Sequence, residues 1–274
     1  MKQTKPYCLK GTFDNSRQHF TWCVKTMAKY YDRCWNPIFG CSGRFDGCDK
    51  CYAKTLMKRR GRDWCDFGKM AINKKQLNKR FDDTPQLIAV CTQSDLFQGD
   101  EGANQGIVDS VLFKCNSSRM NRYLFLTKFS QNMKSYFNDG NLVWRLNKNH
   151  LIPFSFSEMA FGVSVCSQRD VKRIEDLREC KCIEHRFVAF EPVLERIKIG
   201  EGDLSGIEWV VVGAETGEDP TPCRQEWLKD IVSVADRMGI PVFVNAVHAE
   251  DGKVTTEFGE MDEALRRNDI PFSV

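Results

Sequence analysis

Six short apolar runs constrain the fold of this chain more than any other feature of its sequence. They are rich in β-branched and aromatic residues and lie at 86–91 (QLIAVC), 123–127 (YLFLT), 161–165 (FGVSV), 186–190 (RFVAF), 208–213 (EWVVVG) and 241–247 (PVFVNAV). Their apolar residues are continuous rather than alternating, which is typical of strands buried on both faces of a parallel sheet. Stretches with helical spacing lie between the runs, most clearly at 170–180 and 225–239. Strand alternating with helix predicts an α/β fold with a parallel sheet, either open or closed.

The chain has 274 residues, which suffice for one large α/β domain or two small ones. We find no repeat, low-complexity tract or linker in it, so we expect a single domain over residues 1–274. The segment 136–158 is rich in Asn and aromatic residues without clear periodicity, and we expect an insertion or a lid there.

The chain has thirteen cysteines, which would form disulfides in an oxidising compartment and remain free thiols in a reducing one. Charged residues interrupt the hydrophobic ones in the first segment, MKQTKPYCLKGTF, so we expect no secretion signal, free thiols and a cytoplasmic location. No apolar run approaches the roughly 20 residues that a membrane span needs. The net charge of +3 is too small to indicate nucleic-acid binding, and the basic runs at 58–62 and 73–80 resemble solvated helix faces.

Three cysteines, Cys41, Cys48 and Cys51, form a C-x6-C-x2-C array in FGCSGRFDGCDKCY (39–52). If PIFG (37–40) ends a first strand, this array is a strand-to-helix loop. Closely spaced thiols in a reducing compartment favour metal binding over inert core packing.

Two kinds of metal site fit the spacing. A structural zinc ion needs a fourth ligand, for which Cys34, Cys65 and His19 are candidates. An iron-sulfur cube held by three thiolates instead leaves one iron open for a cofactor or substrate. Spacing alone does not decide between them.

Polar residues follow several of the predicted strands, at the edge where parallel sheets form ligand sites. They are Thr92, Gln93, Ser94, Asp95, Lys128, Ser164, Glu191 and Glu215. The histidines show no H-E-x-x-H spacing, and the chain has no G-x-S-x-G, G-x-G-x-x-G or Walker A motif. Hydrolase, dehydrogenase and kinase functions therefore lose their usual sequence support.

The segment WNPIFGCSGRFDGCDKCYA (35–53) resembles the signature of a phage-associated three-cysteine family that is related to radical S-adenosylmethionine proteins and distantly similar to the spore photoproduct lyase type. The resemblance covers about residues 34–256. It continues through SDLF (94–97), LTK (126–128), GVSV (162–165), FEPVL (190–194), EWVVVGAETG (208–217), EW (226–227) and IPVFV (240–244).

The resemblance implies a partial (β/α) TIM-like barrel in which Cys41, Cys48 and Cys51 ligate a 4Fe-4S cluster while S-adenosylmethionine chelates the fourth iron. Reductive cleavage of that cofactor would release a 5′-deoxyadenosyl radical. It also implies an electron donor, a nucleic-acid or nucleotide substrate, and the host cytoplasm if the protein is phage-encoded. No protein partner is indicated. The chain departs from its relatives at Cys166, where they often carry Glu, and at Asn245, where they often carry Lys.

Five residues are candidate cofactor contacts. Tyr52 would pack beside the adenine, or would be the first buried residue of a helix. Ser94 and Asp95 would bind the amino group or the ribose, or would cap a helix. Gly213 and Glu215 resemble the sixth-strand region where the backbone approaches the cofactor, or they begin a turn.

Four more residues are candidates at the strand ends. Lys128 would neutralise a carboxylate or a phosphate, or would be a surface lysine. Ser164 and Glu191 would face the cavity and bind the cofactor or the substrate. A buried Glu191 needs a partner, such as Lys128 or an arginine, or else it marks a turn before Pro192. Cys166 would donate a hydrogen atom to a substrate radical, or would be a small core residue.

The alternative hypothesis is a zinc-binding or cluster-binding nucleic-acid interaction module without catalysis. In it, the three cysteines and Cys34 or Cys65 would form a closed structural site.

Overall fold

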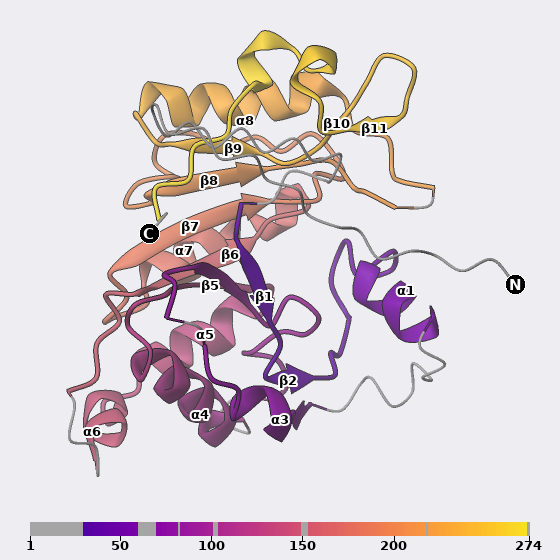
Figure 1. Ribbon diagram of the computed structural model, residues 1–274. Helices are drawn as coiled ribbons and strands as arrows, with labels where there is room; N and C mark the ends of the chain where they lie inside the picture. Colours follow the sequence, from indigo (N-terminus) through magenta and orange to yellow (C-terminus); the bar gives the residue numbers. More distant parts are fainter. Residues whose placement is uncertain are drawn as a thin grey trace, which may run out of the picture.

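Seven parallel strands form one sheet in the computed structural model, which describes residues 30–59, 70–81, 83–100, 104–148, 153–217 and 219–272 (Figure 1). In spatial order they are β1 (Arg33–Trp35), β4 (Leu87–Val90), β5 (Arg122–Thr127), β6 (Met159–Ser164), β7 (His185–Phe190), β8 (Trp209–Val212) and β9 (Val242–Val244). Within this sheet, the strands are neighbours in the same order as they occur along the chain, with β1 paired to β4. No hydrogen bond joins β1 to β9 among the described residues. The predicted α/β fold with a partial (β/α) barrel of parallel strands is confirmed.

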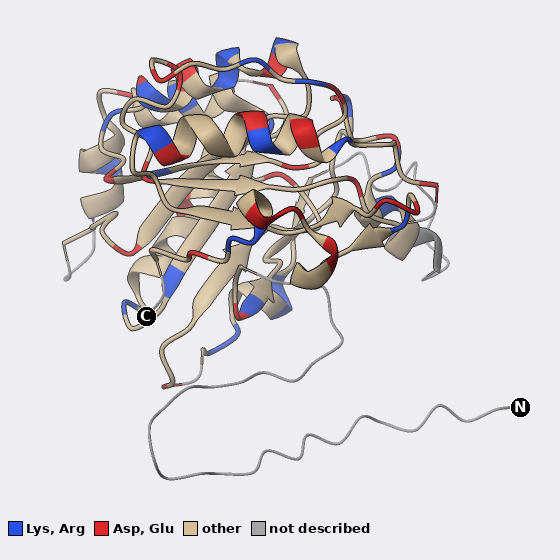
Figure 2. Ribbon diagram, turned by 90° about the horizontal axis from the view of Figure 1, so that it is seen from above, with Lys and Arg blue, Asp and Glu red and all other residues tan. Residues whose placement is uncertain are grey.

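Helices cover the outer face of this half-barrel. They include α4 (Gln105–Asn116), α5 (Ser130–Phe137), α7 (Lys172–Arg178) and α8 (Gln225–Arg237); the other described helices are α1 (Tyr52–Arg59), α3 (Lys74–Leu77) and α6 (Leu142–Asn147). Three-residue 3-10 turns lie at Gln168–Asp170, Phe258–Glu260 and Glu263–Leu265. Figure 1 shows α8 packed over β8 and β9, and Figure 2 shows its acidic and basic residues interspersed rather than segregated. The predicted helices at 170–180 and 225–239 are therefore present.

Alternate residues of each strand enter two different cores. The larger core lies between the sheet and its helices, and the smaller one fills the inner face of the half-barrel with Phe187, Trp209 and Phe243. Gly162 makes room for Phe187, because a Cβ at this glycine would lie 2.6 Å from the ring. Tyr30 precedes β1 and packs edge-on against Trp209 and Phe243, with ring centroids 5.4 and 5.6 Å apart. It thus spans the open side of the half-barrel.

The expected first strand is wrong in position. Ile38–Phe39 (β2) pairs antiparallel with Ala71–Ile72 (β3) in a separate two-stranded sheet, and β1 takes the place in the main sheet. Pro37 separates the two strands and has no N–H to donate to a ladder. A second small sheet joins β10 (Val247–His248) to β11 (Val254–Thr255).

The described parts of the segment 136–158 do not form a lid over the strand ends. They contain the end of α5, the whole of α6 and residues 153–158, which precede β6. Arg145 of α6 bonds Asp109 of α4 with Nε–Oδ2 at 2.8 Å, which holds this segment against the outer helices.

Several sequence features fall outside the described part of the chain. These are His19, Cys65 and most of the basic run at 58–62. No described helix is both long and apolar enough to pass through a membrane. The single domain over 1–274 stays a prediction.

Candidate functional site

Residues 40–51, here called the cysteine loop, connect β2 to α1. Gly47 lies in this loop with a φ of +72°, a conformation that side chains other than glycine rarely adopt. A Cβ there would lie 3.2 Å from Cγ of Pro192 and 3.4 Å from Sγ of Cys166. The loop therefore lies directly against residues that follow β6 and β7, at the carboxyl ends of the strands.

A buried amide fixes the beginning of the cysteine loop. Gln98 accepts a hydrogen bond from the Ser42 N–H at 2.8 Å and donates one to the Gly40 carbonyl oxygen. Asn132 on α5 donates to the carbonyl oxygens of Phe97 and Gly99, each at 2.8 Å, and so holds the segment that carries Gln98. The sequence analysis did not identify Gln98, because nothing local marks a residue whose partners lie 56 and 58 positions away.

The middle of the cysteine loop is held through Asp46. Lys128 Nζ donates to its carbonyl oxygen at 3.1 Å, Ser167 Oγ donates to its carboxylate at 2.7 Å, and Arg169 forms an ion pair with it. Together with Gln98, these contacts tie the loop to segments that follow β4, β5 and β6. Asp46, Ser167 and Arg169 were also missed from the sequence.

The three predicted metal ligands lie within this anchored loop. Cys48 is buried, and Cys41 and Cys51 are partly buried. Burial, the charge of Asp95 and smaller contributions from Cys48 and Cys51 together raise the pKa of Cys41 to about 12, so the three thiols lie within electrostatic range of one another. Burial also raises the pKa of Cys48.

These thiols fit a metal cluster by the chemistry of their donors. Three sulfurs on one glycine-containing loop suit an iron-sulfur cube with an open iron, and a bound cation would favour the thiolates that burial disfavours. In the part of the chain that the structure describes, no three His, Cys, Asp or Glu side chains are arranged as metal ligands. The ligand roles of Cys41, Cys48 and Cys51 therefore stay a prediction.

Asp95, predicted to bind the cofactor, is used within the protein. Its carboxylate accepts hydrogen bonds from Thr127 Oγ1 at 2.6 Å, the Lys128 N–H at 2.8 Å and the Phe97 N–H at 3.1 Å. Burial raises its pKa, and these three donors oppose the shift. It fastens the segment after β4 to the end of β5. Neighbouring Ser94 donates a long bond of 3.4 Å to the Ile38 carbonyl oxygen.

Lys128, Ser164 and Cys166 form one cluster across β5 and β6. Besides Asp46, Lys128 Nζ donates to Ser164 Oγ at 3.1 Å and to Cys166 Sγ at 2.7 Å. Ser164 Oγ donates in turn to the Glu191 carbonyl oxygen at 3.1 Å. The structure thus brings together residues that the sequence placed only at separate strand ends. Cys166 is fully buried.

Glu191 has a different partner from the one expected. Asn245 Nδ2 donates to its Oε1, whereas no ion pair with Lys128 or an arginine is formed among the described residues. Burial raises the pKa of Glu191, while the hydrogen bond from Asn245 and the charge of Lys128 lower it. Gly213 lies beside this pair, since a Cβ there would be 3.4 Å from Glu191 Oε1 and from Asn245 Cβ.

Tyr52 and Glu215 complete the set of candidates. The Tyr52 hydroxyl donates to the Thr92 carbonyl oxygen, and the residue is 52% exposed, so its alternative role as a buried helix residue is wrong. Glu215 accepts bonds from Thr221 N and Oγ1 at 2.8 and 2.7 Å, and Lys50 Nζ lies 3.9 Å from its carboxylate.

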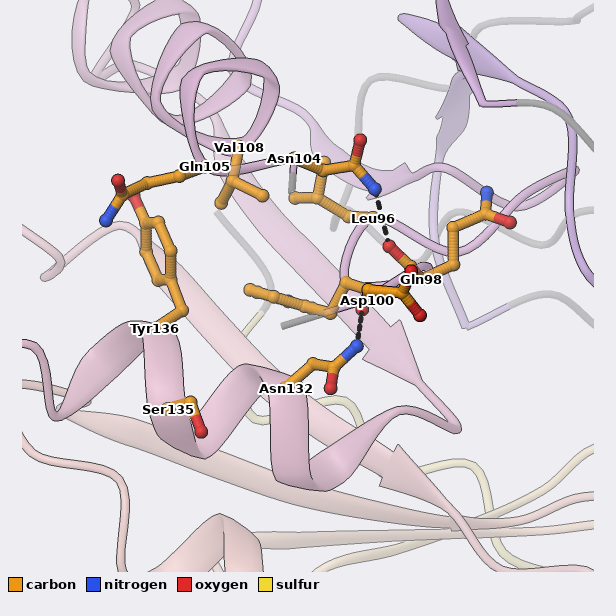
Figure 3. A pocket seen from close by; sticks show the side chains of 10 residues that line it. Leu96, Gln98, Asp100, Asn104, Gln105, Val108, Asn132, Ser135 and Tyr136 are labelled. Atoms are coloured by element: carbon orange, nitrogen blue, oxygen red, sulfur yellow. Dashed lines mark hydrogen bonds between the residues drawn. The ribbon is translucent and has the colours of Figure 1, made fainter. Parts of the chain in front are cut away.

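A cavity of about 160 Å³ lies behind the cysteine loop, between α4 and α5 (Figure 3). Gln98, Asn104, Asn132 and Tyr136 line it, and Asn104 Nδ2 donates to the Gln98 carbonyl oxygen at 2.7 Å. None of the predicted site residues lines this cavity. Its polar side chains support the segment that anchors the cysteine loop, so we place the candidate site at the strand ends.

Comparisons with known proteins give one family and a distant structural likeness. A family model described as "Protein of unknown function (DUF5131)" matches residues 25–259. No curated protein matches the chain. Among solved structures, spore photoproduct lyase complexed with dinucleoside spore photoproduct is similar with a TM-score of 0.37 and 12% identity, over 73% of this chain and 59% of that chain. The chain thus spans less than two thirds of that protein. The expected phage association stays a prediction.

Proposed function

Since this chain belongs to the DUF5131 family, whose description assigns no activity, we propose its function from the strand-end site: a radical S-adenosylmethionine enzyme with a 4Fe-4S cluster on Cys41, Cys48 and Cys51. One observation carries the proposal. The three-thiol loop is anchored against the carboxyl ends of a parallel half-barrel, which is the edge where such sheets bind ligands.

When bound, such a cluster supplies the electron that cleaves S-adenosylmethionine and so yields a 5′-deoxyadenosyl radical. The chain supplies three thiolates and thereby leaves one iron for the cofactor. Gln98 and Lys128 hold the loop in place through its backbone. The proposed chemistry also requires an external electron donor to reduce the cluster.

The surrounding polar residues divide into binding and positioning roles. Tyr52, Ser94, Gly213 and Glu215 are proposed to contact the cofactor. Asp95 is proposed to act indirectly, since its oxygens already accept three internal hydrogen bonds.

Cys166 is proposed to donate a hydrogen atom to the substrate radical. Its S–H bond breaks as a C–H bond forms on the substrate, and the external donor and a proton then reduce the thiyl radical. Lys128 and Ser164 hold the sulfur next to Gly47 of the cysteine loop. Lys128 therefore serves to position this thiol, in addition to any charge that it offers to a ligand.

A nucleic-acid or nucleotide substrate is proposed from the surface near the cysteine loop. Phe39 comes just before the loop and is 41% exposed, while Tyr52 comes just after it and is 52% exposed. Exposed aromatic faces stack on nucleobases without regard to sequence. A cytoplasmic location is proposed as well, since all of the described cysteines are free thiols.

The test is iron and sulfide analysis of protein reconstituted without oxygen, followed by electron paramagnetic resonance with and without S-adenosylmethionine. About four irons per chain and a spectrum that changes with the cofactor are expected. Cys41→Ser, Cys48→Ser and Cys51→Ser should each lose the cluster, and Cys34→Ser should keep it. Stoichiometric zinc that depends on Cys34 would refute the proposal and support a closed structural site instead.

A further inference from the structure

Glu191 and Asn245 form a polar pair with unused hydrogen-bonding capacity. The side chain of Glu191 receives one hydrogen bond from the described residues, from Asn245 Nδ2. Asn245 is only 9% exposed, and its Oδ1 is buried without a hydrogen-bond partner among the described residues. A buried acceptor of this kind costs stability unless some other group donates to it.

The described residues offer no second donor to this pair. Lys128 is the nearest cation that affects Glu191, but its Nζ donates to Asp46, Ser164 and Cys166. An ammonium group has three N–H donors, and here all three are used. Among the described residues none donates to Asn245 Oδ1, so this acceptor is open to a donor on a ligand.

The pair lies at the end of the half-barrel interior. Glu191 follows β7 and Asn245 follows β9, and Gly213 at the end of β8 lies between them without a side chain. Burial raises the pKa values of Tyr30 and Tyr52, and the charge of Glu191 raises both further, so the carboxyl group lies within electrostatic range of both hydroxyls.

The free atoms define the ligand chemistry. Asn245 Oδ1 and the carboxyl oxygens of Glu191 are neighbouring acceptors, which suit the two N–H bonds of one amino group. Carboxylate oxygens accept from the amino group of cytosine, and carboxamide oxygens accept from that of adenine, in this way.

We propose that Glu191 and Asn245 bind the amino-bearing edge of a substrate nucleobase, of the cytosine or adenine type. The nature of the substrate rests on the proposed function, whereas the recognition of an amino group rests on the orphaned acceptor. Within the site, this assigns Glu191 after β7 and Asn245 after β9 to the substrate and leaves the cysteine loop to the cluster.

The experiment measures binding of nucleoside pairs to the full chain by calorimetry. Cytidine is compared with uridine, and adenosine with inosine, because each pair differs by an amino group in place of an oxo group. We expect the amino member to bind at least about tenfold more tightly. Equal affinity within both pairs would overturn the proposal.

Variants of the pair test whether it causes the tighter binding of the amino-bearing nucleosides. Glu191→Met and Asn245→Leu should abolish it, and Glu191→Gln, which can still accept and donate, should keep most of it. The control Glu208→Met removes a glutamate charge at the amino end of β8, where Glu208 pairs with His185. It should leave the affinity difference within each nucleoside pair unchanged. If a preference survives in both Glu191→Met and Asn245→Leu, the pair is not the binding site.

A further titration separates substrate from cofactor, since S-adenosylmethionine also contains adenine. With this cofactor at saturation, cytidine should still bind more tightly than uridine. Loss of that difference would assign the pair to the adenine of the cofactor and overturn the substrate assignment. A chain that forms no cluster but retains the nucleoside preference would refute only the radical enzyme.

Discussion

Asp95 and Glu191 follow different strands of one sheet, and burial raises the pKa of both carboxyl groups. Asp95 accepts hydrogen bonds from three internal donors and joins β4 to β5. Glu191 has the side chain of Asn245 as its donor, and this amide carries an orphaned oxygen. Two carboxyl groups with raised pKa values thus serve two purposes. One carboxyl group is part of the framework, and the other keeps capacity for a ligand.

The largest effect is expected for Asp95→Ala. The substitution leaves the Thr127 hydroxyl and the backbone N–H groups of Phe97 and Lys128 without their acceptor inside the protein, which should lower the free energy of unfolding by about 3 kcal/mol. Urea denaturation followed by circular dichroism measures the change. If the loss were no greater than that of an exposed Asp→Ala control, such as Asp251→Ala, Asp95 would not have its framework role.

A smaller effect of opposite sign is expected for Glu191→Gln. The neutral amide avoids a buried charge, so the variant should be more stable than the parent by about 1 kcal/mol at neutral pH. The folded-state pKa of Glu191 lies above its ordinary value of 4.5. The parent therefore loses no stability from this group below the ordinary pKa. Its free energy of unfolding then falls as the pH rises from the ordinary pKa through the folded-state pKa.

Urea denaturation of parent and Glu191→Gln from pH 4 to pH 8 tests this sign. The difference in stability should grow with pH. A difference that shrinks as the pH rises would mean that the ionised carboxylate is stabilised by the fold, and the contrast with Asp95 would disappear.

The smallest effect is expected for Arg169→Ala. Arg169 pairs with Asp46 of the cysteine loop, but its side chain is 71% exposed, and exposed ion pairs contribute about 0.5 kcal/mol or less. Thermal unfolding should therefore be almost unchanged. A loss of more than about 1 kcal/mol would show that this ion pair is a main anchor of the loop, comparable with the buried contacts.

The strands and the polar residues after them could be predicted because both depend on local sequence. Continuous apolar runs identify buried strands, and the next residues must then lie at the carboxyl edge. Pro37 was the exception, since it divides an expected strand into β1 and β2. The partners of those polar residues could not be predicted. Gln98 binds a loop more than 50 residues away, and Asn245 reaches Glu191 over 54 residues, so no local pattern marks either contact.

The order of the strands in the sheet has a consequence for the timing of assembly. Each strand pairs with a neighbour that the ribosome has already made, so the sheet can grow from β1 to β9 during synthesis. The cysteine loop, however, emerges before Gln98, Lys128, Ser167 and Arg169, which hold it. A nascent chain shorter than these anchors presents its three thiols on an unsupported loop. If the proposed cluster binds only to the anchored loop, its delivery must follow synthesis of the first half of the barrel.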